Sequence, residues 1–243
     1  MSKSEEYWQS LRTLKNWDSF LMENSGLPGP RGNLELAYVV AQEGKLEQFD
    51  HFLTYHAEEN TPEVFVFFCG VMGLGKLAAT QSELFGRLRE YASDPRWRIR
   101  EAVATGLQLT GDQNMDLLLS EMKKWVKGSW YEKRAAAAAL AEPRLLKQAK
   151  HAKQVLQILD KITASMEKAG PSRDDSFKVL QQAMGYCWSV AAAALPEAGK
   201  PIMEDWLDTE NQDIRWVMRE NLKKNRLIKI DAAWVKRSMK KLD

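Results

Sequence analysis

The sequence predicts an all-α protein: a right-handed α-solenoid of HEAT-like two-helix repeats with an armadillo-type superhelix. The hexapeptide Arg-Trp-x-(Ile/Met)-Arg-Glu occurs at 96–101 and again at 215–220. Apolar residues follow helical spacing along the chain, and no stretch shows the period-two alternation of a strand. Recurrence at a long spacing is the signature of a repeat array, in which each helix pair buries its apolar face against its neighbours.

Aromatic residues that open related helices indicate the repeat length. Trp97 and Tyr131 are 34 residues apart, Phe177 lies 46 residues beyond Tyr131, and Trp216 lies 39 residues beyond Phe177. Spacings in the thirties and forties are typical of two-helix HEAT-type repeats.

The expected elements begin with an amphipathic helix over 4–24, which the Pro- and Gly-rich segment 25–32 stops. A loop is expected at 169–175. The remaining helices are predicted at 33–43, 45–57, 62–76, 78–92, 95–109, 112–126, 129–141, 149–169, 174–194, 197–207, 210–225 and 230–241.

We expect a single HEAT-like repeat domain over residues 1–243. Within it, 1–32 form the N-terminal helix and loop, 33–227 the repeats, and 228–243 a C-terminal capping helix. Capping signals support several helix starts, such as the cap and proline in Ser93-Asp94-Pro95.

The charges are unevenly distributed, although the net charge is only +2. Residues through Glu63 include 11 acidic and 5 basic side chains, and the remainder includes 22 acidic and 30 basic ones. A basic C-terminal part suits an anionic partner, with a solvated charged face as the alternative. Cys69 and Cys187 lie far apart and no signal-peptide pattern is present, so we expect a cytoplasmic location and no membrane association.

The segment Gly70–Lys76 matches most of a phosphate-binding loop. Such a loop needs Ser or Thr after its lysine to hold magnesium, and Leu77 stands there instead. The required strand–loop–helix context is missing as well. Gly73-Leu74 of this segment is also in register with Gly106-Leu107 of the next repeat, 33 residues on. We therefore expect no nucleotide cofactor, and the histidines show no spacing of a metal site.

Aromatic residues next to cationic ones are the candidate nucleic-acid contacts, because together they can hold a backbone and stack on an exposed base. The alternative is that the aromatics fill the core and the arginines form an ion-pair ladder between repeats. The candidates are Trp97, Arg100, Lys123, Lys124, Lys127, Trp130, Lys133, Arg134, Tyr186, Arg215 and Arg219.

Three segments carry a family resemblance: 97–101 (WRIRE), 131–136 (YEKRAA) and 182–186 (QAMGY). Over roughly residues 60–226 the chain resembles, distantly, the HEAT-like repeat proteins of bacterial DNA alkylation repair, the AlkD-like alkylpurine DNA glycosylases. The resemblance implies that Glu101 stands in the place of the catalytic carboxylate, Arg134 in that of the phosphate-binding arginine, and Tyr186 in that of a cleft-lining tryptophan.

The chain also departs from the family pattern. Glutamate replaces the catalytic aspartate and tyrosine replaces the cleft tryptophan. The Arg-Glu pair that follows this tryptophan in the family is missing, with Trp188-Ser189 nearby instead. A carboxylate longer by one methylene shifts the charge, and a misplacement of about 1 Å can cost roughly a hundredfold in rate.

These observations favour a binding scaffold whose partly basic concave surface takes duplex DNA or an acidic protein segment. The alternative is a DNA glycosylase that excises alkylated purines without metal or cofactor, with Glu101 stabilising the cationic sugar. The surroundings of two residues separate these functions. An Arg100 tied to its own repeat beside a Glu101 in an open cleft favours the enzyme, whereas a Glu101 bound to a neighbouring helix favours the scaffold.

Overall fold

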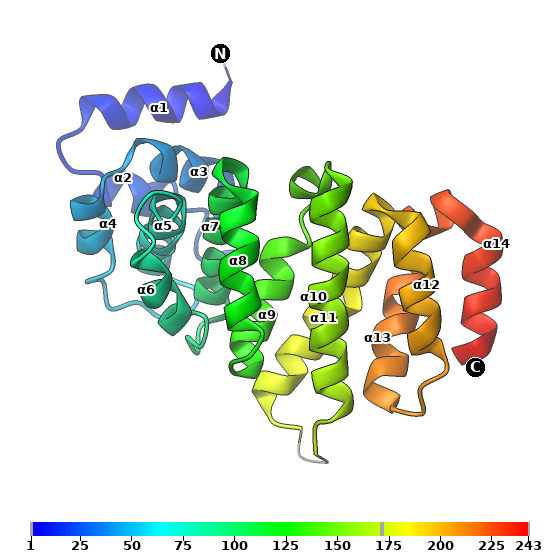
Figure 1. Ribbon diagram of the computed structural model, residues 1–243. Coiled ribbons are helices and arrows are strands. Elements are labelled where there is room, and N and C mark those ends of the chain that lie inside the picture. Colours follow the sequence, from blue (N-terminus) through cyan, green and yellow to red (C-terminus); the bar gives the residue numbers. More distant parts are fainter. Residues whose placement is uncertain (1, 171–172, 243) are drawn as a thin grey trace. The chain divides into compact units, whose positions relative to one another are not determined.

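The structure is a computed structural model that describes residues 2–170 and 173–242 (Figure 1). Over these residues the chain forms fourteen α-helices and one 3-10 helix, Pro143–Leu146, and it forms no strand. The prediction of an all-α protein is confirmed. The two ends of the predicted domain, and positions 171–172 of the predicted loop, lie outside the described residues.

The packing of the helices divides the chain into two compact units, unit 1 over Met1–Asn114 and unit 2 over Met115–Asp243. The prediction of one continuous repeat domain stays a prediction. Unit 1 contains α1 (Lys3–Thr13), α2 (Asp18–Glu23), α3 (Leu34–Glu43), α4 (Leu46–Phe52), α5 (Pro62–Leu77), α6 (Leu84–Tyr91) and α7 (Trp97–Gln113). Unit 2 contains α8 (Met115–Trp125), α9 (Trp130–Leu140), α10 (Ala149–Glu167), α11 (Asp175–Ala194), α12 (Pro196–Leu207), α13 (Gln212–Leu222) and α14 (Asn225–Leu242).

The single N-terminal helix predicted over 4–24 is wrong, because α1 and α2 are separate helices. The Asn16 side chain accepts a hydrogen bond from the backbone N–H of Asp18 at 2.7 Å. The buried Trp17 indole donates back to the Leu11 carbonyl at 2.9 Å. Such local side-chain bonds compete with the helix ladder, so the chain turns between the two helices.

Three later helices differ from the prediction by five residues or more at one end. The helix expected over 45–57 ends at Phe52, and the one expected over 78–92 begins only at Leu84. Helix α14 begins before the expected 230–241 and breaks at Asp231, whose φ of −157° and ψ of 86° are not helical. An Asp231 carboxylate oxygen caps the second part of α14 through the Trp234 N–H at 2.8 Å.

The core of unit 1 is built around α5, which contacts α3, α4 and α7 and is buried along nearly its whole length. Helices α5 and α7 approach most closely at Gly75 and Gly106. A Cβ atom on Gly75 would lie 2.3 Å from the Gly106 backbone. The Thr110 hydroxyl fixes this contact by donating to the Gly75 carbonyl at 2.6 Å. Helix packing thus explains the glycines of the segment that resembles a phosphate-binding loop.

Unit 2 is arranged in two layers of helices. Helices α8, α10, α12 and α14 contact one another in succession, and α9, α11 and α13 do the same. The buried Asn221 joins α13 to α11, because its side chain donates to the Met184 carbonyl and accepts from the Ser189 N–H, both at 2.7 Å. The buried Trp188 indole donates to the Thr163 hydroxyl at 3.1 Å and links α11 to α10.

Candidate functional site

The predicted site residues divide between the two units. Trp97, Arg100 and Glu101 belong to unit 1, and all the others belong to unit 2. Of the three residues to which the family resemblance gives a role, Glu101 belongs to unit 1, and Arg134 and Tyr186 belong to unit 2.

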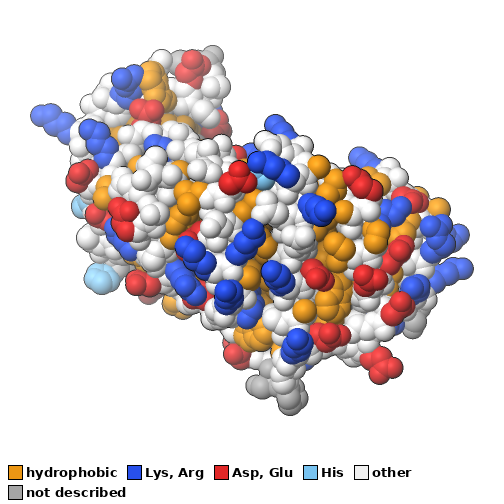
Figure 2. All heavy atoms as spheres, viewed as in Figure 1, with side chains coloured by type: hydrophobic (Ala, Val, Ile, Leu, Met, Phe, Trp, Pro, Cys, Tyr) orange, Lys and Arg blue, Asp and Glu red, His pale blue; other side chains and the backbone are white. Residues whose placement is uncertain are grey.

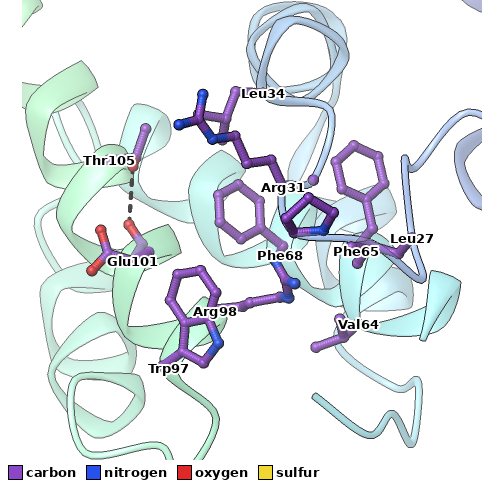
Figure 3. A pocket seen from close by; sticks show the side chains of 12 residues that line it. Leu27, Arg31, Leu34, Val64, Phe65, Phe68, Trp97, Arg98, Glu101 and Thr105 are labelled. Atoms are coloured by element: carbon purple, nitrogen blue, oxygen red, sulfur yellow. Dashed lines mark hydrogen bonds between the residues drawn. The ribbon is translucent and has the colours of Figure 1, made fainter. Parts of the chain in front are cut away.

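In unit 1, Trp97 and Glu101 line a cavity of about 440 Å³, which lies between the Pro- and Gly-rich loop, α5 and α7 (Figure 3). Its walls are mainly apolar, and the parallel rings of Phe65 and Phe68 stand 6.4 Å apart between centroids. The lining residues are Leu27, Pro30, Arg31, Gly32, Leu34, Val64, Phe65, Phe68, Trp97, Arg98, Glu101 and Thr105. Cavities of this size and composition are typical of small-molecule sites.

The buried Arg98 holds the loop side of this cavity in place. Only 8% of Arg98 is exposed. Its guanidinium donates to the Glu59 carbonyl at 3.0 Å, to the Gly29 carbonyl at 2.8 Å and to the Asn60 side-chain oxygen at 3.2 Å. Because these acceptors come from two separate loops, one buried cation fixes both of them against the start of α7.

Trp97 and Glu101 face the same cavity because they lie one helical turn apart at the start of α7. Trp97 is 46% exposed, and the Arg98 guanidinium lies 4.7 Å from its ring centroid. Figure 3 shows the half-buried Glu101 with its carboxylate turned away from Phe65 and Phe68. The Arg100 guanidinium donates to the carbonyls just before α7, those of Asp94 at 2.6 Å and Pro95 at 2.9 Å.

In unit 2, one aromatic cluster joins α9 to α11. The Trp130 and Phe177 rings meet edge to face, with their centroids 5.3 Å apart. Lys133 places its ammonium 4.3 Å from the Trp130 centroid and donates to the Gly128 carbonyl at 2.8 Å. Burial lowers the pKa of Lys133 from its ordinary value. Both predicted residues of this cluster therefore have contacts within the fold.

A second group in unit 2 surrounds Tyr186 on α11, nine residues beyond Phe177. The Tyr186 side chain is 43% exposed. The Arg226 guanidinium lies 4.5 Å and the Lys224 ammonium 5.9 Å from its ring centroid, and Arg226 also donates to the Tyr186 hydroxyl. Arg226 and Lys147 line an adjacent groove of about 570 Å³ whose other lining side chains are apolar. An exposed aromatic ring and two cations thus meet on one surface.

The predicted lysines at the C-terminal end of α8 are exposed. Lys123 donates to the Gln154 side chain and Lys124 to Glu121, each at 2.6 Å, and Lys127 follows the helix. Figure 2 shows Lys and Arg side chains gathered over the middle of that view, where α8 and α10 lie in Figure 1.

The three predicted arginines of unit 2 are used within the fold. Arg134 is buried, with 9% exposed. Arg215 donates to the Lys241 carbonyl at 3.3 Å, and Arg219 donates to the Leu242 carbonyl. Because the last carbonyls of a helix lack partners of their own, Arg215 and Arg219 complete the C-terminal end of α14.

Arg31 and Arg98 are cavity residues that the sequence did not reveal. The repeated hexapeptide indicated the arginine that recurs at its fifth position, Arg100, and not the residue two places earlier, which is Val217 in the second copy. The density of proline and glycine in the segment 25–32 was a signal for an ordered loop, but the sequence did not indicate which helix that loop contacts.

Comparison of the chain with protein-family models, curated proteins and solved structures finds no match. Among the described residues, no cluster of His, Cys, Asp and Glu is suited to holding a metal ion. In the same part of the chain, no helix is both long enough and apolar enough to cross a membrane.

Proposed function

We propose that this chain is a nucleic-acid-binding scaffold and that unit 2 supplies the binding surface. The observation that carries the proposal is the exposed Tyr186 ring with Arg226 and Lys224 beside it. A ring held in this way can stack on a base while the cations neutralise phosphates. Lys147, which lines the same groove as Arg226, adds a further cation to this surface.

The charge balance supports unit 2 as the binding unit. Unit 2 contains 24 basic and 17 acidic residues, a balance of +7, whereas unit 1 contains 11 basic and 16 acidic residues, a balance of −5. Most of the sequence-independent affinity for nucleic acid comes from phosphate neutralisation. Unit 1 is therefore the less suitable surface for a polyanion.

We further propose that the helices form HEAT-type repeats stacked as a right-handed α-solenoid. The two successions of helices within unit 2 support this arrangement, as does the close packing of α5 on α7 at Gly75 and Gly106 in unit 1. Solution scattering tests it. A solenoid should give a radius of gyration clearly above the roughly 18 Å of a compact chain of this length, and a value near 18 Å would count against it.

The binding proposal is tested by fluorescence anisotropy with labelled duplex DNA at several salt concentrations. We expect weak binding that strengthens as salt is lowered, with a log–log slope of several units if several phosphates are neutralised. An acidic peptide with the same net charge as the DNA is tested separately as the alternative ligand. Binding of the peptide but not of DNA would identify the scaffold as a protein-binding one and overturn the proposal.

Replacing Lys123, Lys124 and Lys127 together with glutamate should reduce DNA affinity strongly and make the salt slope less steep. Arg134 is left intact in this variant, because a buried arginine replaced by glutamate would destabilise the fold. The matched control reverses the same number of charges at Lys236, Arg237 and Lys240, exposed charges of α14 that lie outside the proposed surface. Equal losses in the two variants would show a non-specific charge effect.

A second candidate function, excision of alkylated purines, is favoured by one observation in unit 1. Arg100 is tied to the carbonyls before its own helix, while Glu101 lines a cavity together with the exposed Trp97. An aromatic platform one turn from a carboxylate can stabilise the positive charge that develops on the sugar as a cationic base leaves.

Release of 7-methylguanine from methylated duplex DNA in the presence of a chelator tests this second function. If the chain is a glycosylase, Glu101→Gln should reduce the rate far more than DNA binding, because the substitution keeps size but removes charge. No base release at high protein concentration would exclude the enzymatic function and leave the scaffold.

A further inference from the structure

We propose that the unit 1 cavity is a binding site for a small planar aromatic anion, a function separate from the nucleic-acid binding assigned to unit 2. The cavity holds about 440 Å³, within the range of small-molecule pockets. Its shape is set before any ligand arrives, because Arg98 ties both neighbouring loops to α7 through three hydrogen bonds. A preformed cavity loses little conformational entropy on binding.

The walls select an aromatic ligand. Phe65 and Phe68 present parallel rings on the α5 side, and Trp97 presents a partly exposed indole on the α7 side. A flat ligand between these surfaces would bury apolar area on both faces and gain ring–ring contacts.

The rim selects a negative charge. Of the two lining arginines, Arg98 already donates to three oxygen atoms, whereas Arg31 is exposed and has no hydrogen-bond or ion-pair partner within residues 2–170 and 173–242. Figure 3 shows the Arg31 side chain extending from its loop toward the α7 side of the cavity, and the Glu101 carboxylate turned away from Phe65 and Phe68. An anionic group at the edge of a bound ring system would therefore meet Arg31.

Two fluorescent probes that share one ring system separate these two features. Anilinonaphthalene sulfonate carries a negative charge, and N-phenylnaphthylamine is its neutral counterpart. Both should bind the intact chain at one site, and the sulfonate should bind more tightly. Trp97→Ala removes one wall and should weaken both probes by on the order of tenfold. Thr105→Phe fills the cavity from α7 and should abolish both.

Arg31→Gln should weaken the sulfonate by about two- to fivefold, the effect of one exposed ion pair, and leave the neutral probe unchanged. The control is Arg87→Gln, which makes the same charge change at an arginine that pairs with Asp50 and lines no part of the cavity. Circular dichroism and melting curves of each variant show whether the fold is intact.

If sulfonate binding is unchanged in both Trp97→Ala and Thr105→Phe, the site is elsewhere and the proposal is wrong. If Arg31→Gln and Arg87→Gln have equal effects on the sulfonate, the assignment of an anionic ligand is wrong. DNA affinity measured on the same variants keeps this test independent of the proposed function, because unit 2 is unchanged in all of them.

Discussion

The two copies of the repeated hexapeptide occupy very different surroundings. In unit 1, Trp97 is half exposed at a cavity. In unit 2, the Trp216 ring is less exposed and packs against α11, where a Cβ on Gly185 would come within 3.0 Å of it. Arg100 binds carbonyls just before its own helix, whereas Arg219 binds the last carbonyl of α14. The motif lies at the start of α7 but begins inside α13, after the first turn has started at Gln212, and the neighbouring segments decide what its side chains contact.

The position after the tryptophan shows this difference most clearly. Arg98 follows Trp97 and is a buried cation bound to two loops, whereas Val217 follows Trp216 and is an ordinary core residue. Unit 1 needs the cation because a loop rich in proline and glycine lies beside α7. That loop leaves backbone carbonyls to be satisfied, and an apolar side chain could not satisfy them.

Among single substitutions, the largest loss in the free energy of unfolding is expected where a glycine allows two helices to pack closely. Gly75→Ala should lower the free energy of unfolding by about 3 kcal/mol or more, because the new Cβ would lie 2.3 Å from the backbone of Gly106 and backbone cannot easily move. Gly185→Ala in unit 2 should cost less, since its Cβ would meet the Trp216 ring at 3.0 Å and a side chain can shift.

Gly86→Ala is the matched control for both glycine variants. Gly86 lies in α6 with nothing within 4 Å of an added Cβ, so alanine there should stabilise by about 0.5–1 kcal/mol. Urea denaturation of the three variants measures the differences. Similar losses for Gly75→Ala and Gly185→Ala would contradict the account of the α5–α7 contact.

A smaller loss is expected for Arg98→Met. The free energy of unfolding should fall by about 2–3 kcal/mol, because loop acceptors lose their donor where solvent access is limited. Arg12→Met is the control, since Arg12 stacks on the exposed Trp8 ring. This replacement should change the free energy of unfolding by no more than about 0.5 kcal/mol. If the two variants melt alike, Arg98 does not hold the loops in place.

The sequence was sufficient for the all-helical class and for most helix positions, because apolar spacing and caps are local signals. It was insufficient at the turn between α1 and α2, where the single amide of Asn16 and the returning indole of Trp17 decide the path. For the site, the hexapeptide placed Trp97 and Glu101 on one face of a helix. The cavity itself depends on a loop about 65 residues earlier, and no local pattern connects the two.

The smallest expected effect on the free energy of unfolding comes from replacing one carboxylate in each unit, Asp18 in unit 1 or Asp116 in unit 2. Burial alone would raise the pKa of Asp18, but hydrogen bonds from His51 at 2.6 Å and Tyr55 at 2.7 Å hold it below the ordinary value of 3.8. The hydrogen bond between Tyr55 and Asp18 in turn raises the pKa of Tyr55 to about 12. In unit 2, the pKa of the exposed Asp116 is also lowered, and the hydrogen bond from Lys150 is the largest cause.

A carboxyl group whose pKa is lowered in the fold stabilises the protein at pH values above the ordinary pKa of that group. This stability is lost as the pH falls through the lowered pKa. Asp18→Asn should therefore reduce the free energy of unfolding by about 1 kcal/mol near neutral pH. Below the lowered pKa of Asp18 the variant and the parent chain should unfold alike. Asp116→Asn should have a smaller effect at every pH, and denaturation curves across pH measure both. A loss for Asp18→Asn that persists unchanged in strong acid would show that the charge is not responsible.

The most direct test of the central claim, that unit 2 is the nucleic-acid-binding unit, is the salt dependence of duplex-DNA affinity in two charge-reversed variants. One variant carries Lys224→Glu and Arg226→Glu beside Tyr186, and the other carries Lys15→Glu and Lys45→Glu in unit 1. We predict that the unit 2 variant loses on the order of a hundredfold in affinity at low salt and that its log–log slope becomes less steep by about two. The unit 1 variant should keep the slope of the parent chain. An equal loss in both variants, or no loss in the unit 2 variant, would contradict the account.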